Sequence, residues 1–166
     1  MTYPSMDSLY SAKIKTYRYL RKPSKEKIKV GEVRIQVSLI NALDEELARH
    51  NQLDRNQVRR YEAQALVDTG AVRSCLPPHV VEQLGLSLRG QRVAEYADGR
   101  KEMVGVTGPV VISVAGRDTI EEALVLGDEV LIGQTVLEKT DMLVDCTGTR
   151  VIPNPAHPDQ PVSKVK

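Results

Sequence analysis

The chain has 166 residues, enough for one ordinary domain with extensions at its ends, and its hydrophobic residues are largely aliphatic because it contains no Phe and no Trp. Two cysteines are too few for a disulfide framework, which favours a cytoplasmic location. No stretch approaches the ~18 apolar residues of a membrane span or resembles the apolar run of a secretory signal, so we expect no membrane span.

The formal charge of +1 conceals a basic segment at the N-terminus. Residues 1–30 hold eight Lys or Arg against two acids, whereas the rest of the chain is acidic. Residues 1–29 also show no sustained period of 2 or 3.6, so we predict a basic, flexible N-terminal arm there. Such an arm could bind an anionic partner, but most arms of this kind are simply solvated. Nucleic acid is therefore not the expected partner.

The folded domain is predicted to span residues 30–153 and to begin with two strands. Apolar and polar residues alternate over Val33–Leu39, which is the pattern of a half-buried strand. Asn41 or Asp44 is expected to cap a short helix, and a polar stretch then leads to a second strand at Tyr61–Val67. A second short helix is expected to end at Gly85.

The rest of the domain is predicted to consist of hairpins and short strands. Asp98-Gly99, between the segments 92–96 and 100–106, is the strongest hairpin signal in the chain. Further strands are expected at 110–114, 119–126, 130–132, 142–146 and 150–152, with a helical turn at 135–139. This pattern predicts a mainly-β, closed or folded-over sheet with one or two short helices. The proline-rich tail, 154–166, is expected to be extended and flexible.

One segment, Ala65–Ala71, delivers a carboxylate from the end of an apolar strand to a sharp turn. Asp68 follows two apolar residues, where burial of an ionised carboxylate without partners is costly. Its position therefore requires hydrogen bonds from the turn amides or a function that uses the acid. Thr69 adds a hydroxyl group, and Gly70 allows the backbone to approach closely.

This loop, followed by Ser74, resembles the active-site loop of the retropepsin-like aspartic proteases, the retroviral-type family that has single-domain bacterial members. Two further features follow in the family's order. The hairpin 92–106 resembles the flap that covers the substrate, and an apolar-apolar-Gly segment at 131–133 resembles the one beneath the active-site loop. The resemblance covers about residues 31–153, and the ordered combination is more specific than Asp-Thr-Gly alone.

The resemblance implies an aspartic endopeptidase that needs no cofactor and cleaves polypeptide substrates. Its chemistry uses two carboxylates that share one proton, whereas the chain offers one such loop. A homodimer would therefore complete the half-barrel and supply the second Asp68. The ionised Asp68 would activate a water molecule, and the protonated one would polarise the scissile carbonyl and then donate to the leaving nitrogen.

The resemblance also implies which residues support the catalytic acid and bind the substrate. Around the acid they are Thr69, Gly70, Ala71 and Ser74; in the flap they are Tyr96, Ala97, Asp98, Gly99 and Arg100; and in the structural loop below they are Leu131, Ile132 and Gly133. Two departures stand out. Retroviral members usually carry arginine where this chain has Gln134, and the polar helix before the Asp68 strand matches the bacterial pattern.

Other interpretations remain open at this point. Asp-Thr-Gly also forms ordinary turns, and a dimer of the same fold could bind or scaffold peptides without cutting them. A nucleophilic role for Cys75 is disfavoured, because no histidine stands in a motif-like relation to it. The three histidines lack the spacing of a zinc site, so no metal is expected.

Overall fold

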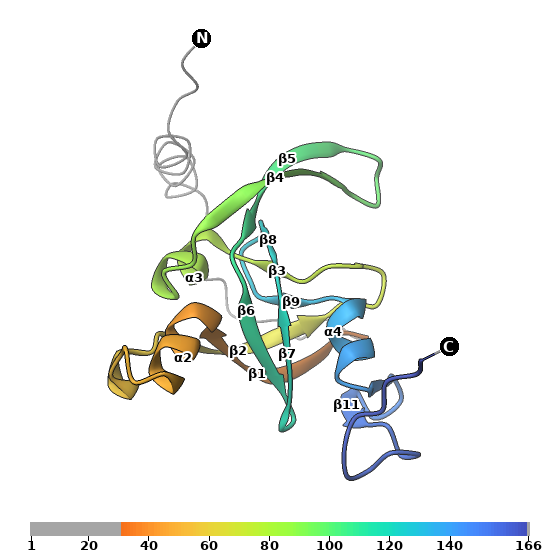
Figure 1. The fold of residues 1–166 in the computed structure, drawn as a ribbon. Coiled ribbons are helices and arrows are strands. Elements are labelled where there is room, and N and C mark those ends of the chain that lie inside the picture. The colour runs from red at the N-terminus through yellow and green to blue at the C-terminus, as the bar shows by residue number, and fades with distance from the viewer. Residues whose placement is uncertain (1–30, 166) are drawn as a thin grey trace. The chain divides into compact units, whose positions relative to one another are not determined.

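A computed structural model of the chain describes residues 31–165. The mainly-β prediction is confirmed, because these residues form a nine-stranded sheet, a two-stranded sheet and a few short helices (Figure 1). The predicted basic arm, 1–29, lies outside the described residues. None of the helices formed by residues 31–165 is long and apolar enough to cross a membrane.

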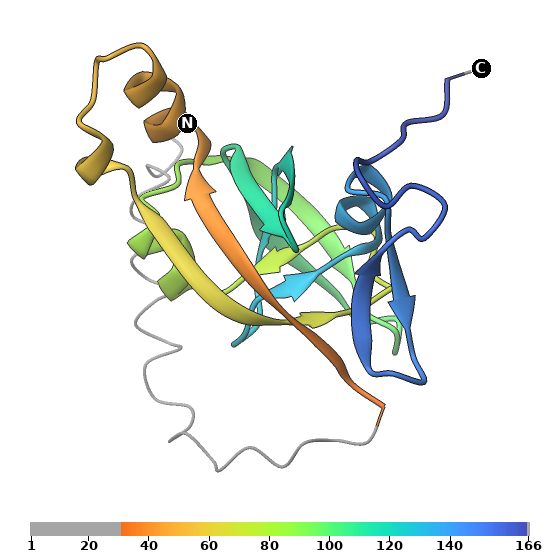
Figure 2. The ribbon, with the colours of Figure 1, turned by 90° about the horizontal axis from the view of Figure 1, so that it is seen from below.

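The large sheet curls around the core of the domain. Its strands are β1 (Val33–Asn41), β2 (Arg60–Val67), β3 (Cys75–Leu76), β4 (Leu88–Glu95), β5 (Lys101–Thr107), β6 (Val110–Val114), β7 (Arg117–Glu121), β8 (Leu124–Val125) and β9 (Leu131–Ile132). They are arranged in the order β4-β5-β8-β3-β9-β2-β1-β6-β7. The two-stranded sheet pairs β10 (Met142–Asp145) with β11 (Arg150–Pro153). Figure 2 shows this small sheet lying beside the large one.

Within the described part of the chain, four short helical segments connect the strands. They are α2 (Ala42–Arg49), the 3-10 turn η1 (Arg55–Gln57), α3 (Pro78–Gln83) and α4 (Gln134–Lys139). Of the two caps predicted for the first helix, Asn41 is the one used, and its side chain accepts hydrogen bonds from the amides of Leu43 and Asp44. The carboxylate of Asp44 instead binds the Arg59 guanidinium at 2.7 and 2.8 Å, which fixes α2 against the start of β2.

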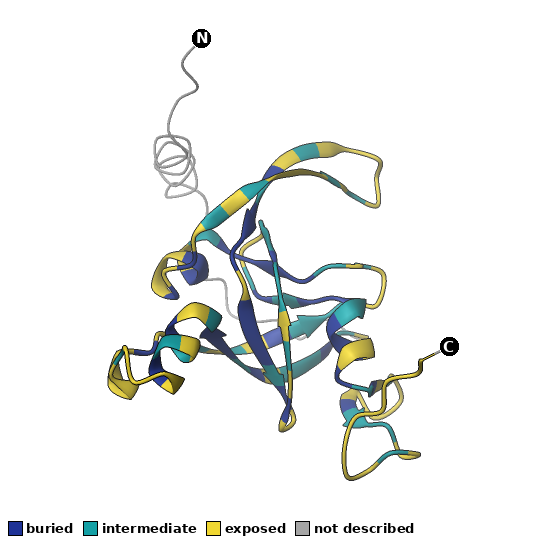
Figure 3. Ribbon diagram, viewed as in Figure 1, coloured by how far each residue is buried: buried dark blue, intermediate teal, exposed yellow. Residues whose placement is uncertain are grey.

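The core consists of valine, leucine and isoleucine, as the lack of Phe and Trp requires. Its fully buried members come from strands that are distant in the sequence, for example Leu39 of β1, Ile112 of β6 and Ile132 of β9. Figure 3 shows the buried positions concentrated in the strands of the body, while the tip of the β4–β5 hairpin is exposed. The strands that carry the site are therefore anchored by fully buried apolar side chains.

One predicted strand, 119–126, is divided in two. β7 pairs with β6, whereas β8 pairs with β5 and β3. The break lies at the buried Ala123, whose amide donates to the Thr107 hydroxyl oxygen (3.0 Å) and whose carbonyl accepts from the Thr107 amide (2.9 Å). The chain passes there from one part of the sheet to another, so the prediction of a single strand was wrong.

The domain boundaries proposed at residues 30 and 153 stay predictions. The structure adds that the first part of the proline-rich tail has defined partners in the body of the domain. The Asn154 amide donates to the Asp141 carbonyl (3.0 Å), and the His157 carbonyl accepts from Arg117.

Candidate functional site

Asp68 lies where an interior strand of the large sheet ends. β2 pairs antiparallel with β1 on one side and parallel with β9 on the other, where Val67 is opposite Ile132. The Asp68 amide continues this ladder by donating to the Ile132 carbonyl at 3.0 Å. The backbone of the acid is thus fixed by two neighbouring strands, while its side chain is half-buried at the sheet end.

The turn after Asp68 supplies the hydrogen bond that the sequence led us to expect. Asp68 Oδ1 accepts from the Gly70 amide at 2.9 Å, and the Asp68 carbonyl accepts from the Ala71 amide at 3.2 Å. A Cβ at position 70 would stand only 3.2 Å from Asp68 Oδ1, so glycine suits this close approach. Thr69 and Gly70 are exposed at the tip of the turn.

The loop after Asp68 crosses the segment that follows β9, and the two are joined by hydrogen bonds. The Ser74 side chain is fully buried, and its Oγ accepts from the Gly133 amide at 3.0 Å. The Gln134 amide donates to the Ala71 carbonyl at 2.8 Å. A Cβ at position 133 would lie 2.5 Å from the carbonyl carbon of Arg73, so only glycine fits this crossing. The crossing holds the acid-bearing loop in place.

The contacts of α4 show what this chain uses where Gln134 replaces the expected arginine. The Gln134 side chain donates to Glu138 within the same helix, at 3.1 Å. The link from helix to loop comes from Thr135, whose Oγ1 lies 3.0 Å from both the Val72 carbonyl oxygen and the Glu121 carboxylate. Thr135 and Glu121 therefore join the loop, α4 and β7, and no sequence pattern singled out either residue.

The predicted flap is the β4–β5 hairpin, whose tip has a well-defined turn. The Tyr96 amide donates to the Arg100 carbonyl (2.9 Å), and Gly99 takes up a φ of +80°, which favours glycine. The hydrogen bond from the Arg100 side chain, together with that from the Arg100 amide, lowers the pKa of Asp98. The Arg100 guanidinium lies 4.9 Å from the centre of the Tyr96 ring, and the Tyr96 hydroxyl donates to Glu102.

Of the predicted site residues, those of the loop and of the segment beneath it lie together, whereas those of the hairpin tip lie apart from them. The loop 68–74 and the segment 131–133 are in direct contact, as described above. The hairpin tip, 96–100, projects from the body above this loop in Figure 1. The arrangement is a fixed carboxylate on one side and an arching, exposed hairpin on the other.

The environment of Cys75 argues against a thiol nucleophile. Burial raises the pKa of the Cys75 thiol to about 11, and the negative charge of Asp68 contributes in the same direction. The thiol therefore stays protonated at neutral pH, whereas the thiolate is the reactive form. Among residues 31–165, no three His, Cys, Asp or Glu side chains gather where they could hold a metal ion.

A groove of about 690 Å³ borders the tip of the loop at Thr69. Its walls are Thr69, part of α4, β10 and the tail residues 162–164. The tail residues reach this groove through contacts made by Asp141 and Arg117, which sequence patterns did not single out. The one local signal was Asp141 itself, because Asp tolerates the positive φ (51°) found there.

Comparison with known proteins gave one match to a family and several to structures. The family model described as "gag-polyprotein putative aspartyl protease" matches residues 55–139, about half of the chain. The search of curated proteins gave no match.

Two of the similar solved structures have about one fifth of their residues in common with the chain. The retroviral protease-like domain of Ddi1 from Leishmania major is 19% identical, with 76% of this chain and 91% of that chain covered and a TM-score of 0.48. The EIAV protease complexed with an inhibitor is 20% identical, with 69% and 91% covered and a TM-score of 0.45.

Proposed function

Because the chain belongs to the gag-polyprotein aspartyl protease family, we propose that it is an aspartic endopeptidase that works as a homodimer. The observation that carries this proposal is the position of Asp68. One of its carboxylate oxygens is held by the Gly70 amide, and within residues 31–165 no hydrogen bond is made to the other, Oδ2. An oxygen of this kind is available to a water molecule in an assembled site.

The catalytic centre would form between two copies of the same loop. One chain contributes one such carboxylate, so a twofold axis beside Asp68 would bring the second into position. Two carboxylates that close cannot both be ionised easily, so the pair would share one proton. The ionised Asp68 would remove a proton from water as this water attacks the scissile carbonyl carbon. The protonated one would polarise the carbonyl and then donate its proton to the departing nitrogen.

The surroundings of Asp68 suit this role because they limit its movement. Hydrogen bonds from the Gly133 amide to Ser74 Oγ and from the Gln134 amide to the Ala71 carbonyl hold the loop from below, and the backbone bond to Ile132 holds it from the side. A catalytic group held in its productive geometry does not have to be ordered again during the reaction. The exposed Thr69 would contact the second loop across the axis.

The β4–β5 hairpin would act as the flap. An extended peptide between the hairpin and the loop could pair with the backbone of residues 96–100, as a strand added to a sheet edge does. The ring of Tyr96, covered by Arg100, stiffens the turn that would close over the substrate. Closure would also exclude water from the reacting centre.

The proposal is tested by peptide digestion between about pH 4 and pH 7 with the wild type and Asp68→Asn. The amide preserves the shape of the turn but cannot act as a base, so cleavage should fall to background. The exposed Asp128 provides a matched control, and Asp128→Asn should cleave like the wild type. Cleavage that survives in Asp68→Asn would contradict the proposal. Peptide binding without cleavage by the wild type would instead identify a dimer that scaffolds peptides.

A further inference from the structure

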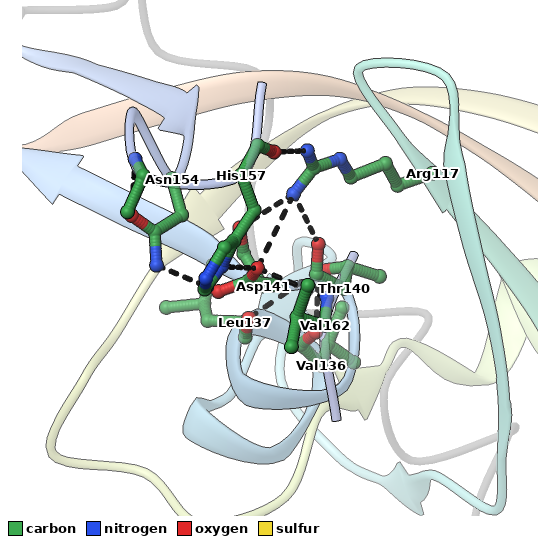
Figure 4. Close-up of polar contacts among 9 residues, drawn as sticks. Arg117, Val136, Leu137, Thr140, Asp141, Asn154, His157 and Val162 are labelled. Atoms are coloured by element: carbon green, nitrogen blue, oxygen red, sulfur yellow. Dashed lines mark hydrogen bonds and ion pairs between the residues drawn. The ribbon is translucent and has the colours of Figure 1, made fainter. Parts of the chain in front are cut away.

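The proline-rich tail is anchored to the body of the domain by one carboxylate. Asp141 directly follows the C-terminal cap of α4, and its side chain accepts three hydrogen bonds from the tail (Figure 4). The donors are the Asn154 amide group at 2.9 Å, His157 Nδ1 at 2.6 Å and the Val162 backbone amide at 3.1 Å. A single acid thus gathers donors from three positions along the tail.

A buried arginine strengthens the first part of this anchor. Arg117, at the start of β7, is only 7% exposed. It donates to the carbonyls of Thr140 (3.1 Å), Asp141 (2.7 Å) and His157 (2.5 Å), as Figure 4 shows. The first two carbonyls lie at the end of α4, where a cation is favoured, and the third belongs to the tail. The tail is therefore firmly bound as far as His157.

Beyond His157 the tail is held much more loosely. Residues 158–165 are all exposed, and the bond from the Val162 amide to Asp141 is the hydrogen bond that fixes them among the described residues. Val162, Ser163 and Lys164 nevertheless line the same groove as Thr69. The tail is thus firmly bound up to His157 and loosely bound beyond it, so its last residues can leave the groove while the anchor stays in place.

The strap, residues 158–164, lines the same groove as Thr69, which is exposed next to Asp68. In the proposed dimer Thr69 contacts the second loop across the axis, so the strap would stand beside the face that the second copy approaches. Leu143 of β10 lines the same groove and is 46% exposed, and Val162 of the strap is 44% exposed. Apolar side chains of this kind gain from burial against a partner.

We propose that residues 158–164 form a displaceable strap that competes with a second copy of the chain for the face carrying Thr69. This inference rests on the proposed function, because pairing is what brings the two acids together. The anchor keeps the strap close to the groove, and a segment on a short tether has an effective concentration of about millimolar. Weak contacts are therefore enough for the strap to compete at low protein concentration, and they yield as the concentration of the second copy rises.

The test is a chain that ends at Pro158. It lacks the part of the strap that lines the groove but keeps Asn154 and His157, and with them the anchor on Asp141 and Arg117. Sedimentation of the shortened and full-length chains should show at least about a tenfold lower dissociation constant for the shortened homodimer. An equal or higher constant would overturn the proposal, because the strap would then be irrelevant to pairing or part of the interface.

Two substitutions in the full-length chain test the same point without shortening it. Val162→Pro removes the amide that donates to Asp141, so it should strengthen pairing in the same direction but less than the deletion does. Val165→Ser changes a residue that is 94% exposed and does not line the groove, so it should leave the dissociation constant unchanged. Should the shortened chain fail to fold, a dissociation constant unaltered by Val162→Pro would by itself overturn the proposal.

Pairing and cleavage are measured separately, so that the two proposals can fail independently. The sedimentation series is repeated in the Asp68→Asn background, where catalysis plays no part. If the shortened chain pairs more tightly but the wild type does not cleave peptides, the strap proposal is supported and the endopeptidase proposal is contradicted. If cleavage depends on Asp68 but the deletion does not change pairing, the endopeptidase proposal is supported and the strap proposal is contradicted.

Discussion

Gly133 shows how a single residue without a side chain holds the candidate site together. It sits where the segment after β9 passes under the acid-bearing loop, and its amide binds the buried Ser74 hydroxyl oxygen. A side chain there would meet the backbone of Arg73 at 2.5 Å rather than the end of a flexible side chain. The requirement for glycine is thus steric, and it explains the apolar-apolar-Gly pattern in physical terms.

We predict that Gly133→Ala lowers the free energy of unfolding by about 1–3 kcal/mol, the usual cost of overpacking. Gly90 is the matched control, because a Cβ there would meet nothing within 4 Å and its φ is not positive. Gly90→Ala should therefore change stability little. Urea unfolding of both variants measures the difference. Equal stability of the two variants would mean that the loops separate easily, and the account of a fixed acid would be wrong.

Asp141 gives a prediction about pH. The amide of Asn154, with further bonds from the Val162 amide and from His157, lowers the pKa of Asp141 to about 2. An acid whose pKa is lower in the folded than in the unfolded chain stabilises the fold above its unfolded value of about 4. This contribution is lost as the pH falls through the folded value.

The melting temperature of Asp141→Asn should therefore lie below that of the wild type at pH 7, and the gap should close as the pH approaches 2. Thermal unfolding at a series of pH values measures it, with the exposed Asp128→Asn as a control that should show no such gap. A gap of constant size down to pH 2 would show that the charge of Asp141 is not what anchors the tail.

Among the elements, the β4–β5 hairpin is the one whose shape depends most on a single turn residue. Gly99 has a φ of +80°, a conformation that Asn tolerates and a β-branched residue does not. We predict that Gly99→Val strains the turn by about 1 kcal/mol or more and lowers kcat/KM at least about fivefold, whereas Gly99→Asn stays close to the wild type. Steady-state kinetics of both variants measure this. Equal kinetics would separate the hairpin from substrate binding.

The longer elements were predictable from the sequence because their pattern is local. Period-2 alternation placed β1, Asn41 capped the first helix as one of two predicted residues, and Asp98-Gly99 marked the hairpin. The two-residue strand β3 was missed, since so short a strand has no period. The break at Ala123 was missed because it depends on Thr107, which is sixteen positions away.

One contact around Asp68 was also predictable from the sequence. The order of Asp68, the hairpin and Gly133 identified the loop and the segment beneath it, and the structure brings these two together. The roles of these residues in catalysis stay predictions. The contacts of Thr135, Arg117 and Asp141 could not be predicted, because each joins segments that are distant in the sequence.

At the scale of the whole molecule, the proposed catalysis depends on two copies of Asp68 acting together. A chain with one such carboxylate is half of an enzyme, so a dimer in which one of the two acids is replaced by an amide should be as inactive as a dimer in which both are replaced. The wild type and Asp68→Asn differ by a single amide, so mixed dimers should form as readily as pure ones.

Peptide cleavage is therefore measured at fixed total protein while the wild type is replaced stepwise by Asp68→Asn under conditions of subunit exchange. Dimers with two intact acids make up the square of the wild-type fraction, so an equal mixture should retain about one quarter of the activity. Activity that falls in direct proportion to the wild-type fraction would show that each chain works alone and would contradict the shared site.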